Sequence, residues 1–332
     1  MSRLKLSVME LVKLTSVSDA AQALETAREL AINVESWGYN RIWVAEHHNM
    51  EAIASAATPV VVSHLAAATK TIRVGAGGVM LPNHVPYVVA EQFGTLENLY
   101  PGRIDLGLGR APGTDGATLR ALRRDVRASE HFADDVLELQ SYFAPRRAGQ
   151  RVVAYPAAGT NVPLWILGSS LYGANLAAAM GLPFAFASQF APQQLHAAIK
   201  VYRENFKPSP QLAQPYIMAG VNVFAASSTE EAEYLSSTAK IFASDFLRGG
   251  PRVLQPPMDA IDEYLTVAEK AQVSEMMKYS FVGDVFKIRQ ELHEFVERTG
   301  VDEVIIVSDI FDPLARLSSY QIAAQAAGLV AQ

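Results

Sequence analysis

Four segments that carry histidines, an arginine, serines or clustered glycines each follow a short apolar run. They are Glu46-His47-His48, Gly75-Ala76-Gly77-Gly78, Gly107-Leu108-Gly109-Arg110 and Gly168-Ser169-Ser170. Strands that all deliver polar or glycine-rich residues at their carboxyl ends are typical of a parallel α/β enzyme with one active-site face. The sequence therefore predicts an enzyme whose chemistry is gathered at one edge of a parallel sheet.

His47 and His48 end the run 42–48, whose first four residues are apolar. Successive side chains of a strand point to opposite faces, so at most one of the two histidines should project straight into a site. A histidine there can exchange a proton near neutral pH. We expect no metal, because adjacent histidines are poor joint ligands and no other histidine or carboxylate cluster completes a shell. A purely structural role for the pair stays open.

Gly77 and Gly78 interrupt a strand that resumes at residues 79–81. Glycine inside a buried strand is costly unless the backbone must approach something closely. A planar ring lying against the backbone would be a sufficient reason, and a bulge that curves the sheet would be another. The glycines alone do not decide between these two interpretations.

Arg110 and the two serines 169 and 170 point to an anion. The run 107–113 is not a dinucleotide fingerprint, because its third glycine is one place late and Pro112 disrupts the turn into a helix. Arg110 is suited to a phosphate, or to a protein carboxylate. Ser169 and Ser170 precede a predicted helix, whose free N–H groups favour an anion, although one serine could simply cap that helix. Together they predict a phosphate site.

Composition limits the classes of partner. The chain has 332 residues, half of them hydrophobic, with a net charge of -6 and a pI of about 5.7, which argues against nucleic acid. The small basic group at 123–127 is interrupted by Asp125, which favours a solvated helix face. The absence of cysteine excludes disulfides and thiolate metal sites. Glu10 and Lys13 argue against a signal peptide, and no apolar run is long enough for a membrane helix, so we expect a cytoplasmic protein without a membrane partner.

Strand-like and helix-like runs alternate along the whole sequence. Strands are expected at 4–9, 41–45, 72–76, 104–108, 164–167, 184–187, 217–225 and 303–307. Helices are expected at 20–37, in an alanine-rich stretch ending near 69, and at 86–99, 129–142, 174–180, 192–205, 229–246, 285–298 and 314–328. About eight strands that alternate with helices predict a single α/β domain over residues 1–332, a closed (β/α)8 TIM barrel with insertions.

Two insertions interrupt this alternation. Residues 146–160 are expected to hold a short hairpin. Residues 248–280 contain several glycines and prolines and form a connection far longer than usual, so they are a candidate lid over the barrel mouth. A packed surface excursion away from the site is the alternative.

Five segments, taken in order, resemble the bacterial luciferase-like, flavin-dependent monooxygenases. They are 43–48, 71–75, 79–82, 90–92 and 101–110, and the similarity spans nearly the whole chain, weakening between 211 and 279. The resemblance implies a (β/α)8 barrel that uses O2 and FMNH2 supplied by a separate flavin reductase. We expect the substrate to be an apolar small molecule. The resemblance also implies that His47 is the catalytic histidine beside the flavin and that His48 belongs to its surroundings.

The resemblance further assigns the cofactor-binding residues. The peptide joining Gly77 to Gly78 matches a cis bond against which the flavin ring rests, and Arg110 matches the phosphate-binding arginine. The phosphate-binding turn is matched by Ser169, Ser170, Tyr172 and Gly173, although luciferase has an acidic residue where Ser169 stands. Related proteins use the deazaflavin F420 for hydride transfer, which is one alternative, and a flavin-binding protein without turnover is another. Family members often pair through helices near the alanine-rich stretch 52–68, so a homodimer is expected.

Overall fold

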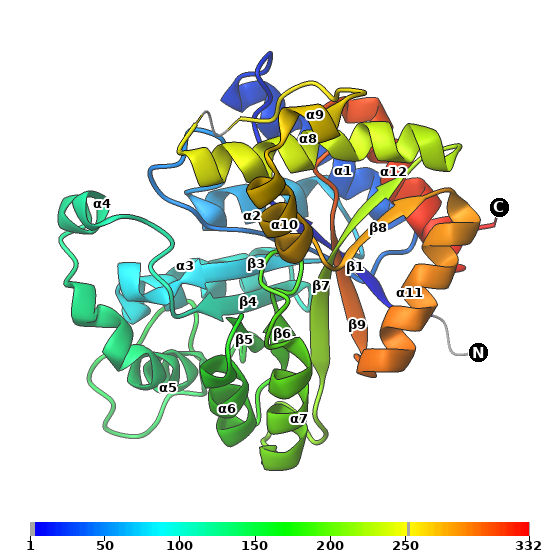
Figure 1. Cartoon of the computed structure of the whole chain (residues 1–332). Helices are drawn as coiled ribbons and strands as arrows, with labels where there is room; N and C mark the ends of the chain where they lie inside the picture. The colour runs from blue at the N-terminus through cyan, green and yellow to red at the C-terminus, as the bar shows by residue number, and fades with distance from the viewer. Residues whose placement is uncertain (1–3, 251–252, 332) are drawn as a thin grey trace.

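Parallel strands alternate with helices throughout the computed structural model, which describes residues 4–250 and 253–331 (Figure 1). Within these residues, eight strands close a barrel and one more joins its rim. The barrel strands are β1 (Leu6–Glu10), β2 (Arg41–Val44), β3 (Arg73–Met80), β4 (Ile104–Gly109), β5 (Leu164–Gly168), β6 (Phe184–Phe186), β7 (Ile217–Ala225) and β9 (Glu303–Val307). The predicted (β/α)8 TIM barrel is confirmed.

Closure of the barrel follows from the pairing of its first and last strands. β1 is parallel to β2 through Val8 and Ile42, and to β9 through Leu6 and Val304. β7 pairs with both β6 and β9, which completes the ring. All nine residues of β7 are buried, as expected for a strand covered on both faces.

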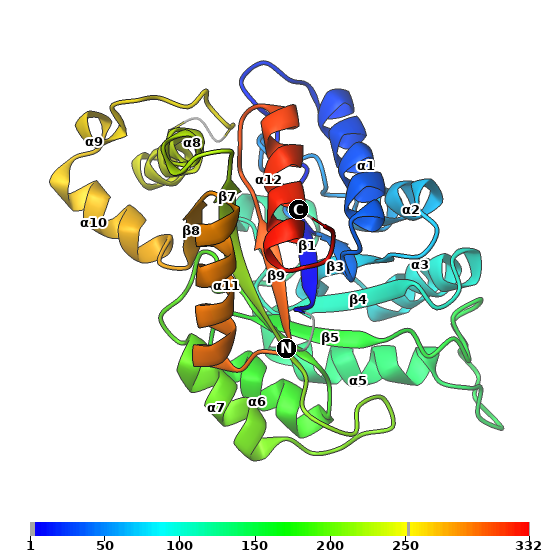
Figure 2. The ribbon, with the colours of Figure 1, turned by 90° about the vertical axis from the view of Figure 1, so that its right-hand side faces the viewer.

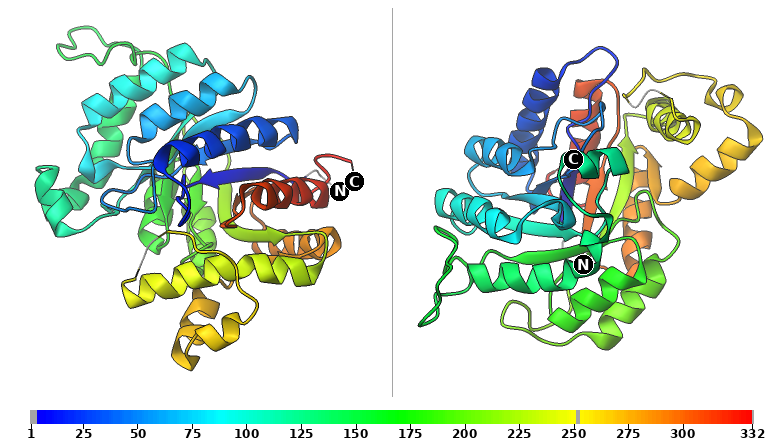
Figure 3. Two further views of the ribbon diagram at one scale, coloured as in Figure 1. Left: turned by 90° about the horizontal axis from the view of Figure 1, so that it is seen from above. Right: turned by 90° about the vertical axis from the view of Figure 1, so that its left-hand side faces the viewer.

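Helices surround the strands on every side (Figures 2 and 3). They are α1 (Ala20–Ser36), α2 (Thr58–Ala68), η1 (Leu81–Asn83), α3 (Pro86–Leu99), α4 (Gly116–Ala121), η2 (Val126–His131), α5 (Phe132–Phe143), α6 (Leu171–Met180), α7 (Leu195–Asn205), α8 (Thr229–Arg248), α9 (Ile261–Tyr264), α10 (Val267–Met276), α11 (Val285–Thr299) and α12 (Pro313–Ala326). None of these described helices is both long enough and apolar enough to cross a membrane.

Local sequence signals set several helix ends. Asp19 begins α1 with a capping box, in which its side chain accepts from the Gln22 N–H and the Gln22 side chain accepts from the Asp19 N–H. Gly181 ends α6 at φ 64°, a conformation that favours glycine. Both ends lie where the sequence predicts them.

The two insertions differ from the predictions in detail. Residues 146–160 contain turns and a cis Tyr155–Pro156 bond and no strand, so the predicted hairpin is wrong. The stretch 248–280 contains the unpredicted helices α9 and α10, which pack beside α8 (Figure 2), and it leads into the unpredicted strand β8 (Ser280–Gly283), which pairs with β7. Pro251 and Arg252 of this stretch lie outside the described residues.

A buried ionic network fills the barrel interior near the amino ends of the strands. Arg41, at the start of β2, contacts Asp105 of β4 at 2.6 Å and Glu303 of β9 at 2.8 Å, while Arg73 of β3 contacts Asp105 at 2.6 Å. Above the network lies an apolar interior layer that includes Met9, Trp43, Trp165, Met218 and Ile305. These two layers occupy the lower part of the barrel, so ligands have access from the carboxyl ends of the strands.

Candidate active site

The carboxylate of Glu46, just after β2, holds two imidazoles. Its Oε1 atom lies 2.8 Å from Nε2 of His48 and 2.7 Å from Nε2 of His84, and the side chain is only 1% exposed. Burial acts to raise the pKa of Glu46, but the hydrogen bonds with His48 and His84 outweigh it and the pKa is lowered. Glu46 is therefore a carboxylate at neutral pH, and we call these three residues the Glu46 cluster.

The Glu46 cluster corrects one expectation from the sequence. One ligand atom from each residue lies within 4.8 Å of the others, so a third potential metal ligand does accompany Glu46 and His48. His84 was missed because it is 38 residues away along the chain, between η1 and α3. The signal was available: segments that follow β2 and β3 must meet at the same barrel rim, because these strands are parallel neighbours.

His47 stands apart from this cluster. Its Nδ1 atom is buried and has no hydrogen-bond partner. Burial lowers the pKa of His47, and a hydrogen bond with the backbone of Gly113, in the loop after β4, only partly opposes that effect. At neutral pH the ring is therefore uncharged, with one nitrogen bonded to the backbone and Nδ1 open. An imidazole in this state can accept or return a proton at Nδ1.

The lowered pKa of His47 predicts a specific loss of stability in mild acid. Below the ordinary histidine value of 6.5, the unfolded chain takes up a proton that the folded protein resists, so the free energy of unfolding falls until the lower folded pKa is reached. Urea unfolding of the wild type and of His47→Gln at pH 8 and pH 5.5 measures this effect. The wild type should lose more stability than the variant, and equal losses would contradict the assignment.

Gly77 and Gly78 lie in β3 and are joined by a cis peptide bond, as the resemblance implies. A Cβ atom on Gly77 would lie 2.7 Å from Cε of Met9, and one on Gly78 would lie 2.6 Å from the carbonyl oxygen of Gly107. The register between β3 and β4 also shifts between Ala76 and Val79. Close packing and an irregular strand are therefore sufficient to require glycine at both positions, and the contact of this peptide with a flavin ring stays a prediction.

Arg110 and Tyr172 come together across neighbouring strands. Arg110 follows the end of β4 and Tyr172 lies in the first turn of α6, after β5; the guanidinium carbon is 4.0 Å from the centre of the tyrosine ring. None of the ion pairs formed by residues 4–250 and 253–331 involves Arg110. The alternative in which Arg110 pairs with a protein carboxylate is thus not what the described part of the chain shows.

The turn before α6 presents its serines without using them as caps. Ser170 is the N-cap residue, yet its hydroxyl makes no capping hydrogen bond, and Ser169 is exposed. The Leu171 N–H instead donates to Oε1 of Gln194, at 3.2 Å, a residue that the sequence did not single out. Gly173 is buried, and a Cβ atom there would lie 3.2 Å from the Phe184 ring, so helix packing explains that glycine. The structure brings Ser169, Ser170 and Arg110 to the same rim.

Comparison with known proteins identifies the family of this barrel. The family model of luciferase-like monooxygenases matches residues 4–303. The chain belongs to this family. A luciferase-like monooxygenase of Escherichia coli (strain K12) is 46% identical over 318 residues, which cover 96% of this chain and 95% of that protein. The crystal structure of apo-MsnO8 is similar with a TM-score of 0.88 and 33% identity, covering 99% of this chain and 100% of that one.

Two more distant solved structures share the luciferase-like fold. One is the oxygenating constituent of a Pseudomonas putida 3,6-diketocamphane monooxygenase in complex with FMN, with a TM-score of 0.74 at 14% identity over 97% of each chain. The other is an F420-dependent secondary alcohol dehydrogenase in complex with an F420-acetone adduct, with a TM-score of 0.72 at 16% identity over 98% of this chain and 99% of that one. Structural neighbours of this fold thus bind FMN or F420.

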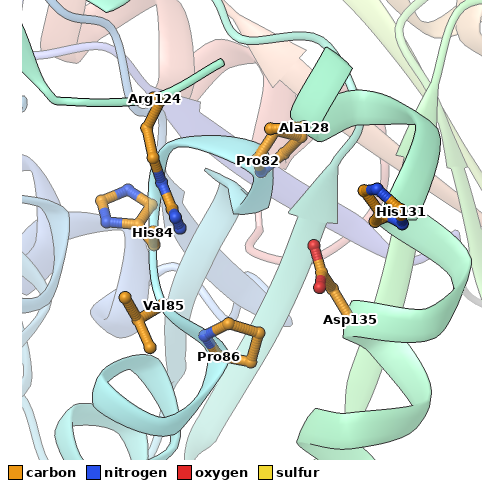
Figure 4. A pocket seen from close by; sticks show the side chains of 8 residues that line it. All are labelled: Pro82, His84, Val85, Pro86, Arg124, Ala128, His131 and Asp135. Carbon is orange, nitrogen blue, oxygen red and sulfur yellow. The ribbon is translucent and has the colours of Figure 1, made fainter. Parts of the chain in front are cut away.

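A cavity of about 210 Å³ in this luciferase-like protein borders His84, one of the three residues of the Glu46 cluster (Figure 4). Its lining side chains are Pro82, His84, Val85, Pro86, Arg124, Ala128, His131 and Asp135. Arg124 therefore borders a cavity, whereas Arg127 pairs with Asp125 at 3.4 Å and Arg123 is exposed, so the predicted solvated face holds for only part of the basic group. The cavity gives small solutes a path to His84.

Proposed function

We propose that this protein is a two-component flavin-dependent monooxygenase, which takes FMNH2 from a separate flavin reductase and uses O2 to oxygenate an apolar small molecule. The proposal rests chiefly on one observation. Arg110, which has no carboxylate partner among the described residues, packs against Tyr172 of the hydroxyl-bearing turn 169–172, and this turn follows the neighbouring strand β5. Membership of the luciferase-like monooxygenase family supports an oxidoreductase. A reductase and reduced flavin are cytoplasmic partners, so we propose that compartment.

The residues present fit a flavin mononucleotide. Arg110 and the hydroxyls of Ser169 and Ser170 supply a positive charge and hydrogen-bond donors for a phosphate, at the N-terminal end of α6. Tyr172 packs on the guanidinium and limits its rotamers. Buried Nδ1 of His47 lacks a protein partner, which suits a group whose hydrogen bond is made only when a ligand is bound.

Each residue has a defined task in this proposal. A reduced flavin held by these residues would supply the electrons for the reaction with oxygen. His47 holds or moves a proton at Nδ1, and Arg110 with the serines anchors the phosphate. The apolar interior layer contains Met9 and Trp43, and Trp43 is 0% exposed. This layer excludes water from the side of the site that faces the barrel interior. Leu254 of the insertion contacts the loop after β1, where its N–H donates to the Leu14 carbonyl at 2.9 Å. We therefore propose that the insertion 248–280 serves as a lid.

Arg110→Met should weaken FMN binding by about 10- to 100-fold, because a charge-assisted hydrogen bond contributes about 1.5–3 kcal/mol. Titration calorimetry with FMN measures the change. Arg151→Met, at an exposed arginine of the stretch 146–160, is the matched control and should bind FMN like the wild type. Equal affinities for all three proteins would remove the phosphate assignment.

The cofactor choice is tested by parallel titration with FMN and F420. F420 exchanges hydride and does not activate oxygen, so tight binding of F420 with no binding of FMN would replace the monooxygenase proposal by the F420-dependent alternative. Binding of FMN without any protein-dependent change in FMNH2 oxidation would favour the third alternative, a flavin-binding protein without turnover.

We propose that the protein forms a homodimer through α2 and α3. These helices contact each other (Figures 1 and 2) and expose Val60 of α2 by 68% and Val88 of α3 by 45%, and Val85, which precedes α3, is 51% exposed. Sedimentation should give twice the chain mass of 36.0 kDa. Val60→Asp should shift the equilibrium toward the monomer, whereas Val267→Asp, at an 85% exposed valine of α10, should not. A wild-type protein that sediments as a monomer at micromolar concentration would refute the dimer.

A further inference from the structure

We propose that Glu46, His48 and His84 bind one divalent transition-metal ion of the zinc type when no flavin is present. This site is independent of the proposed monooxygenase function, which assigns roles to His47 and to the phosphate-binding residues. Two imidazoles and one carboxylate form a ligand set that zinc accepts in proteins, with a fourth position left for water.

The three ligand atoms are already gathered. Both Nε2 atoms lie against the same oxygen of Glu46, at 2.8 Å for His48 and 2.7 Å for His84, and all three ligand atoms lie within 4.8 Å of one another. The side chain of Glu46 is only 1% exposed, and this burial restricts the movement of its carboxylate. The side chains of His48 and His84 are 15% and 29% exposed. The cluster therefore combines an anchored anion with two rings that can adjust.

Little movement is required to admit an ion. Ligand atoms bound at about 2.0–2.2 Å in a tetrahedral site lie about 3.3 Å apart, so each histidine must withdraw from Glu46 by roughly half an ångström. The two Nε2 atoms, which lie within 4.8 Å of each other, must adopt the same spacing. His84 lies in the loop after η1 and borders the 210 Å³ cavity (Figure 4), which provides both the freedom to move and an entry path. Two imidazole donors disfavour Mg²⁺ and Ca²⁺, which prefer oxygen ligands.

The charge of the cluster also favours a cation. Glu46 supplies the one carboxylate of the cluster, and both imidazoles lie against its Oε1 atom. Two cations of this rim are paired with other carboxylates, Lys13 with Asp309 and Arg316 with Glu10 at 2.7 Å, whereas Arg124 lines the cavity wall together with His84. A divalent ion would supply the missing positive charge.

Titration calorimetry with ZnCl2 on the chelator-treated, flavin-free protein tests the proposal. The wild type should bind one zinc per chain, and His84→Gln and His48→Gln should each weaken that binding by about 100-fold or more, since even changes beyond the direct ligands cost about 10- to 100-fold. His131→Gln, which alters the wall of the same cavity, and His64→Gln, at an exposed position of α2, should bind zinc like the wild type. Zinc-edge anomalous diffraction should place the ion between Glu46, His48 and His84.

Three results would overturn the site: no stoichiometric binding by the wild type, unchanged zinc affinity in His84→Gln and His48→Gln, or an anomalous peak at other residues. Unfolding of the variants is checked by their circular dichroism, and Glu46→Gln provides a third variant that retains the shape of the side chain. Because flavin is absent throughout, failure here leaves the proposed monooxygenase function untouched.

Discussion

Replacing His47 with alanine is expected to slow the oxidation of protein-bound FMNH2 by oxygen by at least about 100-fold. A positioned general acid or base contributes typically about 10²- to 10⁴-fold, and the open Nδ1 of His47 with its lowered pKa suits that task. Stopped-flow mixing of the anaerobic protein–FMNH2 complex with aerated buffer follows the appearance of oxidised FMN and gives the rate constant directly.

The matched control for this experiment is His64→Ala, at an exposed histidine of α2 outside the rim. It should retain the wild-type rate constant. FMNH2 binding must be measured for each variant, so that a loss of binding is not mistaken for a loss of proton transfer. If His47→Ala binds FMNH2 and oxidises it at the wild-type rate, His47 has no catalytic task and flavin binding without turnover becomes the better interpretation.

Asp105→Asn is expected to lower the free energy of unfolding by about 3–5 kcal/mol, the range for removal of one partner from a buried ion pair. Asp105 is 1% exposed and accepts hydrogen bonds from Arg41, Arg73 and the Trp43 indole. Burial alone would raise the pKa of Asp105, but the charges of Arg41 and Arg73 outweigh burial and lower it. The asparagine variant keeps the shape and leaves both guanidinium groups short of a negative charge.

Urea unfolding at pH 7 measures the change. Asp259→Asn, at an exposed position in the insertion, should alter stability by no more than about 0.5 kcal/mol. A loss below about 1 kcal/mol in Asp105→Asn would mean that Glu303 alone satisfies Arg41, and that the network contributes little to the stability of the barrel.

The barrel could be predicted from the sequence because its strands carry strong local signals. The runs 217–225 and 303–307 are buried along their whole length and consist mostly of apolar residues, and they coincide with β7 and β9. Helices such as α3 begin at a proline and end where apolar residues stop recurring at helical spacing. Because about eight strands alternate with helices along the chain, a closed barrel is the simplest topology.

What the sequence did not predict depends on contacts between distant segments. β8 has only four residues and pairs with β7 alone, so it lacks the length and periodicity that identify a strand. α10 carries Val273 as its one buried residue among those described, which leaves little apolar pattern to read. His84 lacks a local motif and gains significance only from its proximity to Glu46.

The candidate site also has some features that could be predicted from the sequence and others that depend on contacts between distant segments. Arg110 and the turn 169–172 were brought together correctly, because order along parallel neighbouring strands predicts proximity. An irregular strand at Gly77 and Gly78 was one of the two interpretations of the sequence. The close packing against Gly77, Gly78 and Gly173 could not be predicted, because it depends on which atoms lie beside each glycine. Likewise, Gln194 contacts the α6 N-terminus from 23 residues away, and only the folded structure reveals it.

The most direct measurement is diffraction from crystals of this protein soaked with FMN. The proposal predicts the FMN phosphate within hydrogen-bond distance of the Arg110 guanidinium and of the Ser169 or Ser170 hydroxyl, with the ring system beside Nδ1 of His47. FMN bound elsewhere in the barrel, or an Arg110 that remains directed away from the phosphate, would contradict it.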